Sequence, residues 1–347
     1  MIVWQRKDDP SPMQGNRFWG DRMKRAWLVV LIMTLTAFAA THAQTPASSP
    51  TPVKESSTPA KEKDDDTITT FKVNVRLVNV FVTVTDASGA PVANLQRGDF
   101  QVLEDGYPQQ ISVFSKESEL PLSIVLAVDA SLSTKKDIKT ELDSARRFVH
   151  AILRPVDRLS LYQFTEDVDE LIHFTNDPRK IDTAIDRVQV GAATAMYDAI
   201  YLGADSLLDR TGRKVMVLIT DGGDTVSHAD YHSALKRAQE AEAILYSIIV
   251  VPVESDAGRN TGGEHALIQL SEDTGGKYYY ASDAASMEKA FNQISQELRM
   301  QYLIGYYPSR RFSDSDFRRI DIHLNGSGST SGYHVRHRTG YYNAKAK

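Results

Sequence analysis

The segment that decides the fold reads SIVLAVDASLS and covers Ser123–Ser133. Five consecutive apolar residues are followed by a carboxylate and two hydroxyls at alternate positions, Asp129, Ser131 and Ser133. An unbroken apolar run of this length is typical of a strand that is buried on both faces of a parallel sheet. Ligands of open α/β sheets bind beyond the carboxyl ends of the strands, so the polar residues stand where a binding site is expected.

Three further segments have the same strand character: RLSLYQFT at 158–165, KVMVLIT at 214–220 and AILYSIIVV at 243–251. Apolar residues recur at helical spacing over 138–152 and 287–298, and Ser282 or Asp283 would cap the second of these helices. VDELIHFT at 168–175 follows its predecessor too closely for a helical crossover, which predicts an antiparallel edge strand. The predicted fold class of residues 119–299 is therefore α/β, an open, mostly parallel, Rossmann-like sheet with helices on both faces.

The segments on either side of this α/β part show the alternation of antiparallel strands. Residues 71–118 predict a small β domain, with a β-bulge where the apolar phase changes at Leu77-Val78 and a hairpin turn at Asp105-Gly106. Residues 300–347 return to strand patterns, and we expect this C-terminal extension to pack with the small β domain or beside it.

The N-terminal region has the layout of an export signal. Two cations after Met23 precede an apolar run from Ala26 to Ala40, and cleavage after Ala43 would complete a secretory signal peptide, with Met23 as a candidate start. The alternative is an uncleaved anchor, although the run is shorter than the roughly 20 apolar residues of a membrane span. Residues 44–70 are rich in Pro, Ser, Thr and charge, which predicts a disordered linker. We therefore expect an exported protein of the periplasm, cell envelope or extracellular space.

Composition narrows the function further. The 347 residues contain no cysteine, so neither disulfides nor cysteine lipidation is available after export. The net charge is −5, and removal of residues 1–43 would take away six basic and three acidic residues and leave −8. This acidic balance argues against a nucleic-acid or anionic-membrane partner.

Five side chains with oxygen donors are predicted to meet at the sheet edge: Asp129, Ser131, Ser133, Thr194 and Asp221. Both aspartates end buried strands, and Thr194 lies in the loop that enters a helix. Mg²⁺ prefers oxygen ligands, keeps several waters and is held by only one or two carboxylates, so this set suits it, with Mn²⁺ or Ca²⁺ as substitutes. An acidic side chain of a protein partner would then complete the shell of the metal.

The same five residues, as Asp129-x-Ser131-x-Ser133 with Thr194 and Asp221, resemble the metal-ion-dependent adhesion site of von Willebrand factor type A domains. That resemblance implies a strand order of 3-2-1-4-5-6 with an antiparallel edge strand. Residues 71–343 further resemble the von Willebrand factor A-related acidobacterial domain proteins, in phrases such as DFQVLEDG, ATAMYDAI, VLITDGGDT and YLIGYYP. One departure is Ala193, where the family often has glycine.

Other interpretations remain open from the sequence. Ser131 and Ser133 could cap a helix starting near Thr134, which would make the protein a metal-independent scaffold. A metal-dependent hydrolase is disfavoured, because no G-x-S-x-G elbow and no glycine-rich phosphate loop follows the first strand. We therefore predict no catalytic residue and no small-molecule substrate.

Several polar residues near the predicted site and in the C-terminal tail are expected to have structural roles and not to bind the metal. Asp224 is expected to cap or solvate a turn, and Glu166 and Asp167 are expected to belong to a solvated loop. The tail histidines His323, His334 and His337 are expected to be exposed strand residues.

Overall fold

The structure is a computed structural model that describes residues 77–117, 120–132, 138–251, 261–310, 317–325 and 332–342. The predicted signal segment, the linker and Ser133 lie outside the described residues, as do residues 71–76, on which the proposed β-bulge depends. Within the described part of the chain, no helix is long and apolar enough to cross a membrane.

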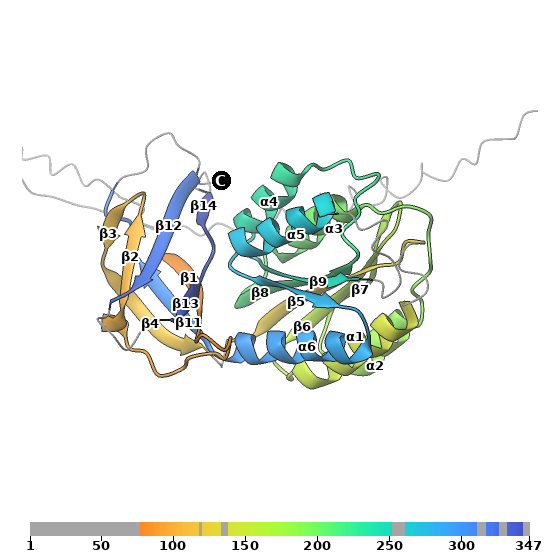
Figure 1. Cartoon of the computed structure of the whole chain (residues 1–347), viewed down its shortest axis with the longest axis horizontal. Coiled ribbons are helices and arrows are strands. Elements are labelled where there is room, and N and C mark those ends of the chain that lie inside the picture. Colours follow the sequence, from red (N-terminus) through yellow and green to blue (C-terminus); the bar gives the residue numbers. More distant parts are fainter. Residues whose placement is uncertain are drawn as a thin grey trace, which may run out of the picture. The chain divides into compact units, whose positions relative to one another are not determined.

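The centre of the α/β part is a six-stranded sheet with the order β10-β9-β8-β5-β6-β7 (Figure 1). Its strands are β5 (Leu122–Asp129), β6 (Arg158–Phe164), β7 (Val168–Thr175), β8 (Arg213–Thr220), β9 (Ile244–Val250) and β10 (Lys277–Ala281). Five strands are parallel, and only the edge strand β7 runs antiparallel, to β6. The predicted open sheet and its antiparallel edge are thus confirmed.

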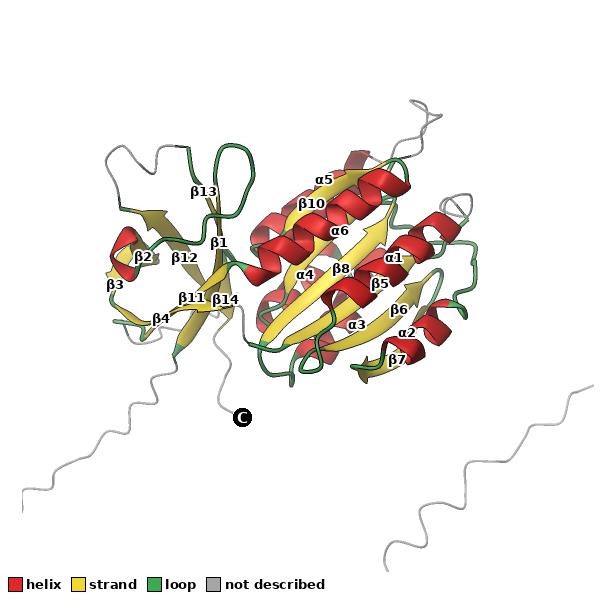
Figure 2. Ribbon diagram, turned by 90° about the horizontal axis from the view of Figure 1, so that it is seen from below, coloured by secondary structure: helices red, strands yellow, loops and turns green. Residues whose placement is uncertain are grey.

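Helices cover both faces of this sheet. They are α1 (Ile138–Ile152), α2 (Pro178–Ile185), α3 (Met196–Leu207), α4 (Tyr231–Glu240), α5 (Thr261–Asp273) and α6 (Ala284–Arg299). One apolar cluster joins the strands to α1, α2 and α6, which lie in front of the sheet in Figure 2. A second cluster joins the strands to α3, α4 and α5 on the opposite face.

Burial explains why these strands have no polar face. Every side chain of β5 and β9 is buried, as the unbroken apolar runs predict. Burying one Val, Leu or Ile side chain contributes about 1.5–3 kcal/mol, which exceeds the roughly 1 kcal/mol of a helix cap.

The cap of α6 is Asp283, whose side chain accepts a hydrogen bond from the backbone N–H of Ser286 at 2.7 Å. This decides between the two capping residues that the sequence left open.

The segments flanking the α/β part form a β unit of two antiparallel four-stranded sheets, with the orders β13-β1-β11-β4 and β14-β12-β2-β3. Its elements are β1 (Val78–Thr85), a 3₁₀ turn (Arg97–Asp99), β2 (Phe100–Glu104), β3 (Tyr107–Gln109), β4 (Ile111–Glu117), β11 (Gln301–Tyr306), β12 (Phe317–Leu324), β13 (His334–Arg336) and β14 (Gly340–Tyr342). Each sheet combines strands from before and after the α/β part. Asp105 (φ 49°) and Gly106 (φ 80°) form the predicted hairpin turn between β2 and β3.

A buried carboxylate joins the two sequence halves of the β unit. Glu104 on β2 accepts hydrogen bonds from the hydroxyls of Tyr306 (2.9 Å) and Tyr341 (2.8 Å) and forms an ion pair with Arg318 on β12. Both ionic side chains are almost fully buried. Because three later strands converge on one residue of β2, the C-terminal extension completes the core of the β unit.

Candidate metal-binding site

Asp129 ends β5 and is fully buried. Its Oδ1 accepts a hydrogen bond from the backbone N–H of Ser131 (2.9 Å), and its Oδ2 accepts one from the hydroxyl of Thr220 (2.6 Å). Burial raises the pKa of Asp129 from 3.8 to about 6, hydrogen bonds from Thr220 and Ser131 oppose the rise, and the nearby charge of Asp221 adds to it. An ionised Asp129 is therefore a costly group that a cation would stabilise.

Asp221 follows directly after β8, the strand that pairs with β5. It is partly buried, and its Oδ1 accepts a hydrogen bond from the backbone N–H of Gly223 at 3.2 Å. β5 and β8 are paired up to Val128 and Ile219, and the hydroxyl of Thr220, the residue before Asp221, is bonded to Asp129, so the two carboxylates lie at neighbouring ends of parallel strands.

Thr194 is buried in the loop before α3 and is attached to the loop after β8. Its backbone N–H donates to the hydroxyl of Thr225 (2.9 Å), and its carbonyl accepts from the backbone N–H of Thr225 (2.9 Å). Thr225 lies four residues after Asp221. The structure thus connects the loops that carry Thr194 and Asp221.

The loop carrying Thr194 is also bonded to the loops after β5 and β6. The N–H of Gly191 donates to the carbonyl of Ala130 (2.9 Å), and the N–H of Ala195 donates to the carbonyl of Thr165 (2.6 Å). A Cβ at residue 191 would lie 2.4 Å from the Cβ of Thr165, so this close approach requires glycine. Ser131 is buried one residue beyond Ala130. Four of the five predicted residues therefore stand on loops bonded to one another, and the fifth, Ser133, lies outside the described residues.

Two carboxylates have more specific roles than the sequence suggested. Glu166 is exposed, yet its Oε2 accepts from the backbone N–H groups of Ala192 (2.8 Å) and Ala193 (3.4 Å), and these bonds lower its pKa. It is exposed in its loop, as expected, and in addition braces the Thr194 loop. Asp224 caps a backbone group, as expected, but one that lies 28 residues earlier in the sequence. Its Oδ1 accepts a hydrogen bond from the N–H of Met196 (2.9 Å) at the start of α3.

The alanine at position 193 leaves this loop unstrained. Among the described non-glycine residues, only Asp105 and Glu242 have a positive φ. Ala193 therefore occupies an ordinary backbone conformation that does not need glycine.

The donor set fits a hard divalent cation. The described residues contain no group of three or more His, Cys, Asp and Glu side chains that could hold a metal. Here two carboxylates are instead combined with neutral hydroxyls, a composition that suits Mg²⁺ rather than zinc. The full burial of Asp129, at the end of the strand that pairs with the one before Asp221, is the structural observation that a bound cation would account for.

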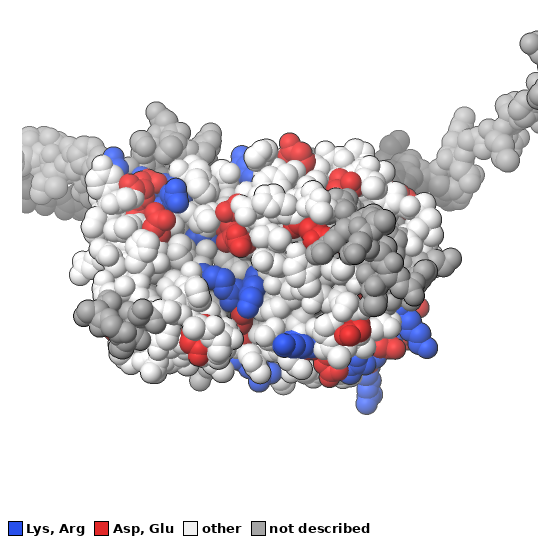
Figure 3. Space-filling model, in the orientation of Figure 1, with Lys and Arg blue, Asp and Glu red and all other residues white. Residues whose placement is uncertain are grey.

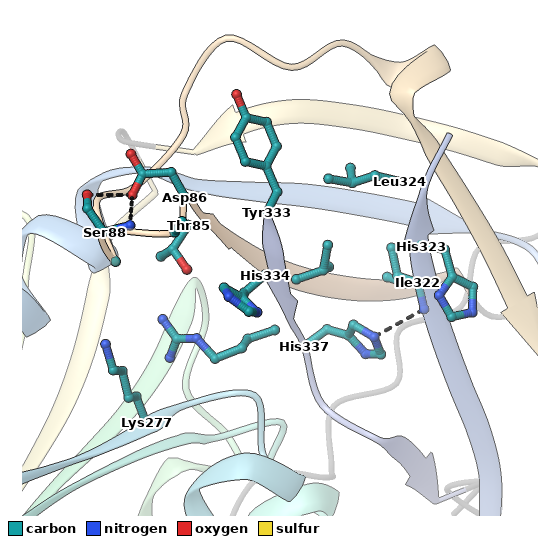
Figure 4. Close-up of a pocket in the computed structure, with 14 residues that line it drawn as sticks. Thr85, Asp86, Ser88, Lys277, Ile322, His323, Leu324, Tyr333, His334 and His337 are labelled. Atoms are coloured by element: carbon teal, nitrogen blue, oxygen red, sulfur yellow. Dashed lines mark hydrogen bonds between the residues drawn. The ribbon is translucent and has the colours of Figure 1, made fainter. Parts of the chain in front are cut away.

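A groove of about 960 Å³ in the β unit is a separate feature, lined by residues of β12, β13 and the turn after β1 (Figure 4). The three tail histidines line it. His323 and His334 are exposed, as expected, whereas His337 is half-buried and its Nε2 accepts from the backbone N–H of Ile322 at 3.1 Å. Burial lowers the pKa of His337, so this histidine is a neutral structural residue.

The sheet order defines a doubly wound α/β domain with the strand order 3-2-1-4-5-6. Residues 123–293 match the family model of the von Willebrand factor type A domain. The chain therefore contains a von Willebrand factor type A domain. Comparison with curated proteins gives no match.

Solved structures similar to this chain include bacterial proteins. A von Willebrand factor type A protein from Catenulispora acidiphila is 11% identical, with a TM-score of 0.45, covering 78% of this chain and 75% of that one. The vWF domain of the type V pili tip protein Mfa5 from Porphyromonas gingivalis is 13% identical (TM-score 0.43; 51% and 94%). The PilB minor pilin from Streptococcus sanguinis is 14% identical (TM-score 0.41; 52% and 61%). These likenesses concern the fold alone.

Proposed function

We propose that this protein binds a protein partner through a Mg²⁺ ion that captures an Asp or Glu side chain of the partner. The observation that carries the proposal is the fully buried Asp129, held beside Asp221 on loops that are hydrogen-bonded to the loop of Thr194. When bound, Mg²⁺ supplies an open coordination position for a carboxylate oxygen. Ser131, Ser133 and Thr194 would offer hydroxyl ligands, and the two aspartates would hold waters of the ion. Mn²⁺ or Ca²⁺ would substitute.

The hydrogen bonds of Asp129 favour a binding function over a catalytic one. Both oxygens of Asp129 already accept hydrogen bonds, from Ser131 and Thr220, so this group is poorly placed to take a proton from a substrate. The surface agrees with a protein partner: acidic and basic side chains form small mixed groups on the face shown in Figure 3, where no broad cationic area is seen among the described residues. The signal-like segment before residue 44 supports an exported location in the periplasm, the envelope or the extracellular space.

The first test is calorimetric titration of Mg²⁺ into the purified chain and its Thr194→Ala variant. We expect one saturable site in the parent and at least about tenfold weaker binding in the variant, because one hydroxyl ligand is lost while the backbone bonds of the loop remain. Thr183→Ala, which removes an exposed hydroxyl on α2, is the matched control and should bind as the parent does. Equal Mg²⁺ binding by the parent and Thr194→Ala would exclude Thr194 as a ligand. Absence of Mg²⁺ binding in the parent would favour a metal-independent scaffold.

Glu166 provides a test of the bracing of the loop. Glu166→Ala removes the acceptor of two backbone N–H groups next to Thr194, so Mg²⁺ affinity should fall by about three- to tenfold, the range of one ordinary hydrogen bond, because the exposed position of Glu166 weakens its bonds. Asp167→Ala removes the neighbouring carboxylate and should leave the affinity unchanged. A larger loss in Asp167→Ala than in Glu166→Ala would contradict the assigned role.

A further inference from the structure

Three exposed aliphatic side chains stand on the loops that carry the proposed metal-site residues. Leu132 is 56% exposed, Val190 is 40% exposed and Val226 is 43% exposed. They account for three of the five exposed Leu and Val side chains among the described residues. They stand on the loop after β5, the loop before α3 and the loop after β8, which are the loops that carry the site residues. We name these three residues the apolar collar.

The collar stands on backbone that is held in place. The N–H of Val226 donates to the carbonyl of Thr194 at 3.3 Å. Val190 precedes Gly191, whose N–H is bonded to Ala130, and Leu132 follows the buried Ser131. Because the neighbouring backbone is bonded across loops, the three side chains remain in water until something covers them. Exposed aliphatic groups that keep a fixed position around a polar centre are typical of a binding surface.

Charge on the same loops restricts what can cover the collar. The described parts of the loops after β5, β6 and β8 and of the loop before α3 contain six acidic residues, Glu166, Asp167, Asp186, Asp221, Asp224 and Asp230. Arg187, whose guanidinium is bonded to the carbonyl of Leu171, is the one cation of these described stretches. The rest of the loop after β5 adds Lys135, Lys136 and Asp137 in sequence, so acidic residues outnumber basic ones on the four loops. One carboxylate of a partner would be drawn to the metal, but further acidic residues beside it would be repelled.

We propose that the apolar collar selects partners in which the metal-binding Asp or Glu is flanked by apolar side chains. This inference rests on the proposed function and names the partner class: a protein segment with the pattern apolar–acidic–apolar. Apolar flanks would cover Leu132, Val190 and Val226 and exclude water from the bond between metal and carboxylate. Exclusion of water strengthens that electrostatic bond, because the effective dielectric constant around it falls. Free dicarboxylates and acidic polysaccharides lack such flanks.

The test uses three fluorescent peptides that differ only in their central residues, Leu-Glu-Leu, Ser-Glu-Ser and Leu-Gln-Leu, titrated with the full chain in excess Mg²⁺. We expect Leu-Glu-Leu to bind at least about tenfold more tightly than Ser-Glu-Ser. Leu132→Ser and Val226→Ser should reduce this preference to less than about threefold without changing the calorimetric Mg²⁺ affinity. The matched controls are Val156→Ser and Leu202→Ser, whose side chains are equally exposed, at 56% and 44%, but lie away from the site. Both controls should keep the parent's preference.

The outcomes separate the collar from the metal site. Equal binding of the Leu-Glu-Leu and Ser-Glu-Ser peptides by the parent, or a preference that survives in both collar variants, would overturn the collar alone. Failure of both glutamate peptides to bind the Mg²⁺-loaded chain would contradict metal capture of a carboxylate as well as the collar. Equal binding of Leu-Gln-Leu and Leu-Glu-Leu, or binding that persists in EDTA, would instead refute metal capture of a carboxylate, and the collar inference would fall with it.

Discussion

Asp129→Asn is expected to abolish Mg²⁺ binding and, in the absence of metal, to make the chain more stable than the parent at neutral pH. The substitution keeps the shape of the side chain and an acceptor for the N–H of Ser131, but it removes a buried charge. Burial raises the pKa of Asp129 from 3.8 to about 6, so the folded state favours the protonated carboxyl. This contribution to stability is fully present below about pH 3.8 and is lost as pH rises through about 6. Above pH 6, the ionised group costs about 3 kcal/mol.

Melting curves between pH 4 and pH 8 in EDTA would measure this effect. The Tm of Asp129→Asn should rise above that of the parent as pH increases from about 4 to about 6, and Mg²⁺ should then stabilise the parent but not the variant. Protons compete with the ion for Asp129, so Mg²⁺ should stabilise the parent less below pH 6. If the parent were more stable than the variant at pH 7.5 in EDTA, the ionised side chain of Asp129 would not destabilise the folded chain.

Asp157→Asn is the matched control, and its expected change in Tm at neutral pH is opposite to that of Asp129→Asn. Asp157 is also fully buried, but its side chain accepts hydrogen bonds from Arg154 and from the backbone N–H of Leu122. Burial raises the pKa of Asp157, and these hydrogen bonds outweigh burial and lower it. Its contribution to stability is therefore present above the unfolded pKa and lost as pH falls. Asp157→Asn should lower Tm at neutral pH, where Asp129→Asn raises it.

Arg318→Met is expected to lower the free energy of unfolding by about 3–5 kcal/mol, or to prevent the β unit from folding. Arg318 and Glu104 form a buried ion pair between β12 and β2. Without the guanidinium, the carboxylate keeps only the hydroxyls of Tyr306 and Tyr341, which cannot neutralise its charge. Urea unfolding followed by circular dichroism would measure the loss.

Two further variants test whether this loss comes from an uncompensated buried charge. Arg319→Met, next to Arg318 but exposed and 3.6 Å from Asp321, should change stability by less than about 0.5 kcal/mol. The double variant Glu104→Leu with Arg318→Met should recover much of the loss, because it removes both charges from the core. A double variant less stable than Arg318→Met alone would contradict this explanation.

The supporting residues of the site illustrate what sequence patterns miss. Glu166 bonds to backbone groups 26 and 27 residues away, and Asp224 bonds to the start of α3, 28 residues before it. Neither contact leaves a periodicity or a short motif, because it depends on where the strand ends meet. The apolar collar could not be predicted from the sequence either, because the sequence does not distinguish an exposed Val or Leu from a buried one.

The sequence by itself determined the parts of this protein that local chemistry controls. Unbroken apolar runs identify strands buried on both faces, and the pair Asp105-Gly106 identifies a turn. The carboxylates at the end of β5 and directly after β8 predict the binding edge. Tertiary structure alone decided which residues brace the loop of Thr194 and which strands the C-terminal extension joins. Alternation marks β12 as a strand, but its pairing with β2 rests on a contact across more than 200 residues. Such pairing depends on complementary packing and on the charge of Glu104, and neither property belongs to one segment of the chain.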